Sequence, residues 1–255
     1  MRKSVLPVLL LGGVAWGQEQ EVEGSANQAS LEDPNAISLR WNNGLEFETA
    51  DGRFRGHLGL WIIQDWGFGT QDDEVDDDKG AFVDGSELRA ARFYSFGTVY
   101  DTIDYRAAYE FESGDAEFLD VYLDFRDAGP TSLRIGHGFE PFGLESITPL
   151  HQLNFAERSL PSALTPLRNT GVMAHGNFSE AKVATYGLGV FRSTYRFGND
   201  SETGNVAADD GEYSLSARLT WATEVASSSA LHLGASVSHR RSEDDLVRFR
   251  AGTES

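Results

Sequence analysis

Eight basic side chains with the chemistry of an anion-binding site are spread along the chain. Arginine suits such a site because its planar guanidinium donates two parallel hydrogen bonds and stays charged at any working pH. A histidine adds partial positive charge near neutral pH. The candidates are Arg89, Arg92, Arg106, Arg134, Arg158, Arg168, Arg218 and His57.

These residues also have structural interpretations, because an arginine beside acidic neighbours commonly forms an ion pair that serves only the fold. Ion pairing is the alternative to anion binding for Arg106, Arg134 and Arg218. Anchoring of an irregular segment is the alternative for Arg89, Arg158 and Arg168. For His57 the alternative is a solvated side chain. The sequence leaves these interpretations open.

Patterns typical of enzymes and metal sites are absent from the sequence. The six histidines, at positions 57, 137, 151, 175, 232 and 239, show no His-Glu-x-x-His or other metal-binding spacing, and no Gly-x-Ser-x-Gly motif occurs. The absence of cysteine excludes a thiol nucleophile. We therefore predict neither an enzyme nor a cofactor or metal. A barrel enzyme with scattered Ser and His residues remains an alternative.

The charge of the chain excludes one class of partner. Forty Asp and Glu residues against 21 Lys and Arg give a net charge of -19, so binding of nucleic acid through its phosphates is not expected. Part of the excess is the run DDEVDDD at 72–78. A solvated loop explains this run, and a divalent-cation contact with anionic lipopolysaccharide is the alternative. The run lacks the Gly and Glu spacing of an EF-hand.

The N-terminus carries an export signal. Arg2 and Lys3 precede an apolar run that ends in Ala15-Trp16-Gly17, a small-x-small cleavage pattern. We predict a signal peptide at 1–17 and a flexible acidic lead-in at 18–35. No later run of about 18 apolar residues predicts a membrane-spanning helix, but the spanning strands of a β-barrel are shorter.

The rest of the chain alternates apolar and polar residues with a period of two, as strands with one apolar and one polar face do. Hairpin turns are predicted at Asn43-Gly44 and Asp51-Gly52. The clearest strands are predicted at 54–66, 104–112, 118–126, 213–221 and 231–237. Aromatic residues stand near the ends of the apolar faces, as they do at the two membrane interfaces.

The predicted connections alternate between long and short. Long ones are expected near 67–85, 139–167 and 192–211, while the connection at 113–115 is shorter than this pattern requires. The asymmetry favours a transmembrane antiparallel β-barrel, with a soluble β-sandwich as the alternative. About nine complete strands and the start of a tenth at Leu246 are predicted, so the chain resembles the front part of a larger barrel.

The segment 139–167 breaks the alternation. It contains Pro141, Pro149, Pro161 and Pro166, and prolines fix the path of an irregular chain. Two stretches here, RIGHGFEPFGLE at 134–145 and NFAERSLPSALTPLRNTGV at 154–172, resemble the phosphate- and polyphosphate-selective outer-membrane porins. The resemblance extends to 39–61 and 86–101.

The resemblance implies a barrel at 36–255 that has sixteen strands when complete, forms homotrimers and lies in the outer membrane against lipid and lipopolysaccharide. It also implies a third loop folded into the pore and arginines and lysines that bind the anion. The chain departs from the family pattern at three places: His57 replaces an arginine, Ala90 replaces the second member of an arginine pair, and Phe139-Glu140 replaces a basic position.

The predicted function follows from these departures and from the acids that alternation places on the inner face, which are Asp104, Glu110, Glu112, Asp120 and Asp124. We expect a channel for small hydrophilic solutes with at most a modest preference for phosphate or other anions. The alternatives are a general or cation-preferring porin, a soluble periplasmic β-sandwich binding protein, and a structural or adhesive barrel. The inward glycines Gly187 and Gly189 favour open space over a filled lumen.

Overall fold

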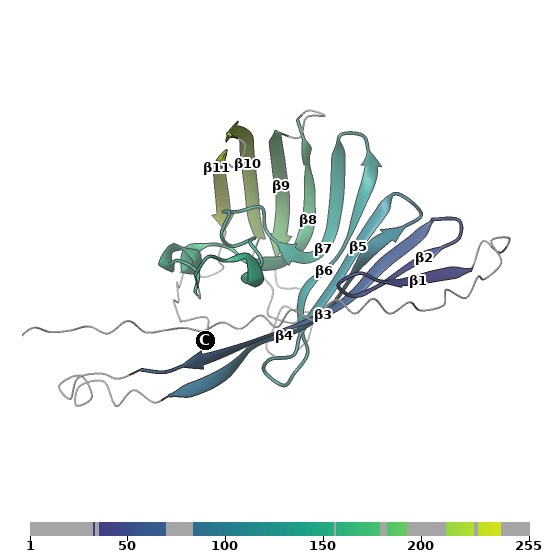
Figure 1. Cartoon of the computed structure of the whole chain (residues 1–255). Coiled ribbons are helices and arrows are strands. Elements are labelled where there is room, and N and C mark those ends of the chain that lie inside the picture. The colour runs from purple at the N-terminus through teal and green to yellow at the C-terminus, as the bar shows by residue number, and fades with distance from the viewer. Residues whose placement is uncertain are drawn as a thin grey trace, which may run out of the picture.

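The computed structural model describes residues 33, 36–69, 84–155, 157–178, 183–192, 213–226 and 229–240. Within these ranges, eleven strands form one antiparallel sheet whose order in space is the order in the sequence (Figure 1). The predicted signal peptide, the acidic run at 72–78 and the strand start at Leu246 lie outside the described residues, as does nearly all of the predicted lead-in. The predicted all-β antiparallel fold is confirmed.

The strands lengthen after a short N-terminal hairpin. The hairpin consists of β1 (Ile37–Trp41) and β2 (Leu45–Thr49). The long strands are β3 (Phe54–Gly67), β4 (Gly85–Val99), β5 (Ile103–Glu110), β6 (Glu117–Ala128), β7 (Thr131–Phe139), β8 (Arg168–Asn177), β9 (Ala184–Arg192), β10 (Tyr213–Ala226) and β11 (Ser229–Arg240). The nine strands from β3 onward agree with the predicted number. The five clearest strand predictions fall on strands, except that the one at 104–112 ends two residues early, at Glu110.

The two faces of the sheet differ in chemistry. One row of direct cross-strand partners from β6 to β10 is Leu123, Ile135, Val172, Val190 and Leu215. Between 44 and 51% of each of these residues is exposed. The neighbouring row is Asp124, Arg134, Met173, Gly189 and Ser216. Because strand side chains alternate between faces, the first row lies on an aliphatic outer face and the second on a mostly polar inner face.

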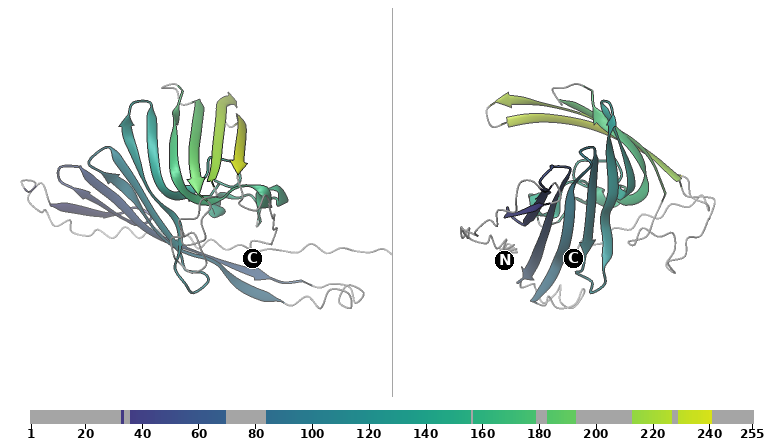
Figure 2. Two further views of the ribbon diagram at one scale, coloured as in Figure 1. Left: turned by 180° about the vertical axis from the view of Figure 1, so that it is seen from behind. Right: turned by 90° about the vertical axis from the view of Figure 1, so that its right-hand side faces the viewer.

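The sheet curves around its inner face and is open between β1 and β11 (Figure 2). An exposed aliphatic row across five strands is what a lipid-facing surface requires. A β-sandwich would need a second sheet packed on the first, and the described strands form a single sheet. No helix in the described part of the chain is long and apolar enough to cross a membrane.

Positive backbone φ angles mark the tight turns. Asn43 has φ 52° and Gly52 has φ 71°, so the two predicted hairpin turns are confirmed. Between β4 and β5, Tyr100 and Asp101 have φ 52° and 62°. Two consecutive positive φ angles are typical of a tight hairpin turn, and this short connection joins the paired residues Val99 and Ile103.

Candidate functional site

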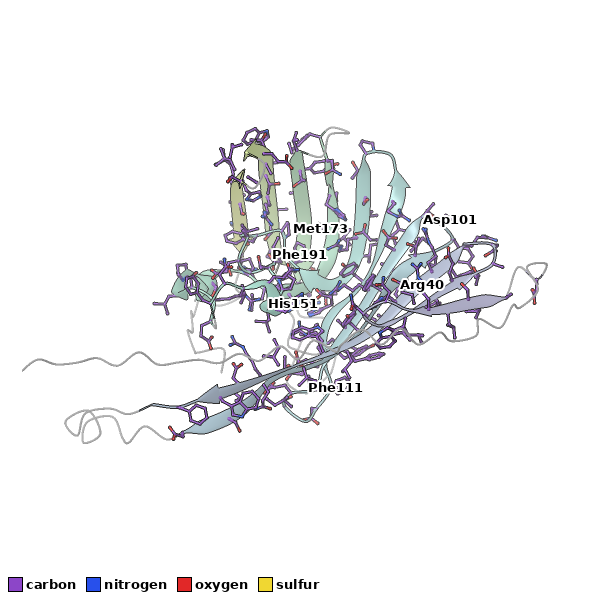
Figure 3. The ribbon with its side chains drawn as sticks, viewed as in Figure 1. Arg40, Asp101, Phe111, His151, Met173 and Phe191 are labelled. Atoms are coloured by element: carbon purple, nitrogen blue, oxygen red, sulfur yellow. The ribbon has the colours of Figure 1, made fainter. Side chains whose placement is uncertain are left out.

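The long connection between β7 and β8, residues 140–167, is here called the loop segment. Its ends coincide with the predicted break, and its regular parts are two short 3-10 helices, η1 (Leu150–Gln152) and η2 (Leu160–Leu164). The ring of His151 packs edge-on against Trp61 of β3 at 5.5 Å. Gly143 N donates to Ser236 Oγ of β11 at 3.1 Å. The loop segment therefore crosses the inner face from β11 to β3, and Figure 3 shows His151 within the curve of the sheet.

Glu140 holds the beginning of the loop segment. Its backbone N–H donates to Leu167 O at 3.0 Å, which joins the two ends of the segment. Its carboxylate is fully buried and accepts four side-chain hydrogen bonds. The donors are Asn169 Nδ2 at 2.6 Å, Ser214 Oγ at 3.1 Å, Arg240 Nη2 at 2.5 Å and Ser216 Oγ. Glu140 therefore ties the loop segment to β8, β10 and β11 and does not present its charge to an open lumen.

Arg158 and Glu145 organise the interior of the loop segment. Arg158 Nη2 donates to Thr148 O at 3.0 Å, and Arg158 Nε donates to Glu145 O at 3.3 Å. The Glu145 carboxylate accepts hydrogen bonds from Ser159 N at 2.7 Å and from Ser159 Oγ. The side-chain hydrogen bond from Ser159 lowers the pKa of Glu145 below its ordinary value of 4.5, and the Ser159 backbone bond adds to this effect.

The lowered pKa predicts an acid-sensitive loop segment. A carboxylate whose folded pKa is depressed adds stability above its ordinary pKa, and this stability is lost as the pH falls through the folded pKa. We expect cleavage of the loop segment in limited proteolysis to be slow from neutral pH down to about 4.5 and faster below it. Glu145→Gln should be cleaved faster than the parent at neutral pH and should show a weaker pH dependence. Identical pH profiles of the two proteins would contradict this prediction.

A cavity of about 490 Å³ lies between the loop segment and the inner face. Six of the eight predicted basic residues line it: Arg92, Arg106, Arg134, Arg158, Arg168 and Arg218. The carboxylates in its lining are Asp120 and Glu140. We call this space the loop cavity. Six arginines against two carboxylates give the lining an excess of positive charge, which ion pairs of Arg92 with Glu110 and of Arg134 with Asp124 reduce.

Two of the lining arginines are fixed by a carboxylate and an aromatic ring together. Arg92 Nε and Nη2 donate to Glu110 at 3.1 and 2.8 Å, and the guanidinium carbon lies 4.5 Å from the centroid of the Trp61 ring. Arg134 Nε and Nη2 donate to Asp124 at 3.0 and 2.8 Å, and its guanidinium carbon lies 4.1 Å from the Tyr122 centroid. These contacts hold the two cations in place on the wall.

The other arginines on the wall differ in how many of their N–H donors are bonded to a carboxylate. Arg168 donates to both carboxylate oxygens of Asp120, at 3.2 and 3.1 Å. Arg106 lies 3.7 Å from Asp120 and is 40% exposed. Arg218 lines the cavity from β10, and no carboxylate among the described residues forms an ion pair with it. Arg106 and Arg218 therefore keep donors available for a solute.

Two of the sequence candidates lie outside the lining of the loop cavity. Arg89 forms ion pairs with Asp65 at 3.1 Å and with Glu157 of the loop segment at 3.6 Å. His57 lines a second cavity near the β1–β2 hairpin, where its ring stacks on Phe96. Their roles in anion binding stay predictions, as do those of the six arginines in the loop cavity.

Sequence reasoning missed the roles of three residues that shape the site. Trp61 supports both Arg92 and the loop segment, His175 Nε2 lies 2.8 Å from Asp124 Oδ2 beside Arg134, and Glu140 fastens the loop. Alternation could have placed His175 on the inner face, because His175 stands two residues after Met173 in the same strand. No local signal marks Glu140, because its partners are distant in the sequence.

An open antiparallel sheet with a lipid-compatible outer face, a polar inner face and a long segment crossing that inner face defines a porin-type channel protein. A family model described as phosphate-selective porin O and P matches residues 64–253. The chain therefore belongs to this porin family, which is a family of channels rather than of enzymes and suggests an outer-membrane location. A search of curated proteins found no match.

Proposed function

We propose that the protein forms an outer-membrane channel that passes small anions, phosphate among them, through the loop cavity. The observation that carries the proposal is the lining of that cavity, in which six arginines stand against two carboxylates, one of them buried in its own hydrogen-bond network. Other hydrophilic solutes pass as well, because the inner face is polar over several strands.

The arginines act as a series of weak sites. Arg106 on β5 and Arg218 on β10 offer unused donors from different parts of the curved wall, and each replaces part of the hydration shell of the ion. Arg92, Arg134 and Arg168 keep fixed partners, so they contribute mainly a positive potential that an anion experiences at a distance. This division of the arginines into two groups favours passage of the ion, because the arginines do not all bind the ion at the same time.

The wider setting belongs to the same proposal. We propose that the sheet is part of a closed barrel, since an open strand edge is not tolerated in a lipid core. The protein would be exported through the signal at 1–17 and would form a homotrimer in contact with lipid and lipopolysaccharide. The loop segment would be the constriction of the pore, which its contacts with Trp61 and Ser236 support.

The decisive experiment is a planar-bilayer recording of the full-length protein. In a salt gradient we expect a reversal potential with the sign of anion preference, and we expect added phosphate to reduce the chloride current in a saturable way. The preference should weaken at high salt, because screening shortens the reach of the arginine charges. A reversal potential of the opposite sign would favour the cation-preferring alternative.

A further inference from the structure

A second cavity, of about 620 Å³, lies on the inner face beside the β1–β2 hairpin. We call it the hairpin cavity. Arg106 and Tyr122 line both this cavity and the loop cavity, so the two are neighbours along one wall. Its volume is within the range of small-molecule sites, which is about 300–1,000 Å³.

The chemistry of the hairpin cavity differs from that of the loop cavity. Three arginines line it, together with four carboxylates, among them Glu46, Asp104 and Asp124. Several of these charges already have partners: Asn42 Nδ2 donates to Glu46 at 2.8 Å, and Thr98 Oγ1 donates to Asp104 at 2.7 Å. The lining is thus nearly balanced in charge and rich in both donors and acceptors, which favours neither an anion nor a cation.

An aromatic cluster stands on this otherwise polar wall. The rings of His57 and Phe96 are stacked with centroids 4.9 Å apart, and the ring of Tyr94 is parallel to both within 8°. Phe96 is 42% exposed although it lies on the inner face. The stacked neighbours hold the Phe96 ring in place, and its exposed part offers an apolar plane to a solute.

The neighbouring strands make room for these rings. A Cβ at Gly59 would collide with the ring of Tyr94, and a Cβ at Gly44 would collide with the ring of His57. The absence of a side chain at Gly59 and Gly44 therefore allows the rings of Tyr94 and His57 to pack directly against the backbone at these positions. The cluster is consequently an organised surface whose geometry depends on residues from β3, β4 and the β1–β2 turn.

We propose that the hairpin cavity is a binding site for a neutral, polyhydroxylated ring such as a saccharide. A sugar ring has an apolar C–H face, which fits the plane of Phe96, and equatorial hydroxyls, which donate to carboxylates and accept from arginines. Balanced charge with an exposed ring is the combination that such a solute requires. The proposal goes beyond anion passage, and its test rests on the proposed channel.

The test measures interruption of the channel current of the full-length protein by maltose. We expect a saturable reduction of the current, and we expect Phe96→Ala to weaken the association constant at least about fivefold. Phe96→Leu, which keeps apolar bulk without a flat ring, should weaken it similarly. Phe93→Ala is the matched control, because Phe93 is also 42% exposed but comes directly before Tyr94 in β4 and pairs with Leu60, so its ring lies on the outer face.

Each outcome has one meaning. Weaker maltose binding in both Phe96 variants with parental binding in Phe93→Ala supports the site. No effect of maltose on the parent, or equal effects in the Phe93 and Phe96 variants, overturns it. Interruption by lysine or glutamate but not by maltose overturns it in favour of a charged solute. A phosphate titration on the same membranes separates this result from anion passage, because Phe96→Ala should leave the phosphate effect unchanged.

Discussion

Replacing Glu140 by alanine should release the loop segment and lower the free energy of unfolding by about 3 kcal/mol. The buried carboxylate accepts bonds from Asn169, Ser214, Ser216 and Arg240. Its removal takes the shared acceptor away from all four donors and the ion-pair partner away from Arg240. The loop segment loses its attachment to three strands, so the single-channel conductance should rise. Unfolding in detergent and single-channel recording measure the two effects.

Glu112→Ala serves as the control for Glu140→Ala. It removes the same charge from an exposed position in the connection between β5 and β6, and no ion pair or hydrogen bond of its side chain is found among the described residues. Both of its measurements should equal those of the parent. Glu140→Gln keeps the shape but donates where an acceptor is needed, so its stability should fall between the two. Parental stability of Glu140→Ala would show that the four hydrogen bonds are not needed to hold the loop.

The case of Glu140 also shows what the sequence alone cannot predict. An acid at a position where the family pattern is basic suggests a loss of anion attraction. Its side-chain partners Ser214 and Arg240 lie 74 and 100 residues away in the chain, so nothing local indicates that its charge is buried and compensated. The strands and the limits of the loop segment were predictable, because the alternation that reports them is local.

Irregular strand pairing sets a second limit. Between β5 and β6 the register shifts between Ala107 and Tyr109, which places Tyr109 opposite Phe118, and the two rings meet at 5.2 Å. Simple alternation assigns Phe118 to the polar face of β6, because the next residue, Leu119, is on the apolar face. A β-bulge adds one residue to one strand and reverses the faces beyond it, and no residue type in this stretch announces it.

The candidate arginines were predictable as a group but not in their individual roles. Residue type was enough to select the six arginines that line the loop cavity as candidates. Alternation could not bring them together, since Arg158 lies in the segment where alternation stops. Which of them have free donors depends on the carboxylates opposite them, such as Asp124 for Arg134 and Asp120 for Arg168. Those pairings follow from cross-strand register, and the difference between Arg134 and Arg218 emerges only when the strands are paired.

That difference gives the second large expected effect. Arg218→Ala and Arg134→Ala each remove one positive charge from the lining of the loop cavity, so their effects on the mean potential should be similar. Only Arg218→Ala removes donors that are not already bonded to a carboxylate among the described residues. A hydrogen bond to a charged group contributes about 1.5–3 kcal/mol, so the constant for phosphate reduction of the chloride current should rise about tenfold or more in Arg218→Ala.

For Arg134→Ala we expect a change of about twofold, because its Nε and Nη2 donors already bind Asp124 and a solute loses only a distant charge when they are removed. His175, which also lies beside Asp124, limits the exposure of the remaining carboxylate. Phosphate titrations of both variants beside the parent, at low and high salt, make the comparison. The charge effect should shrink with salt in both variants, whereas the excess loss in Arg218→Ala should persist, since a direct hydrogen bond is screened less than a distant charge. Equal constants for the two variants at every salt concentration would mean that phosphate responds to the summed charge of the cavity and that no single arginine binds it.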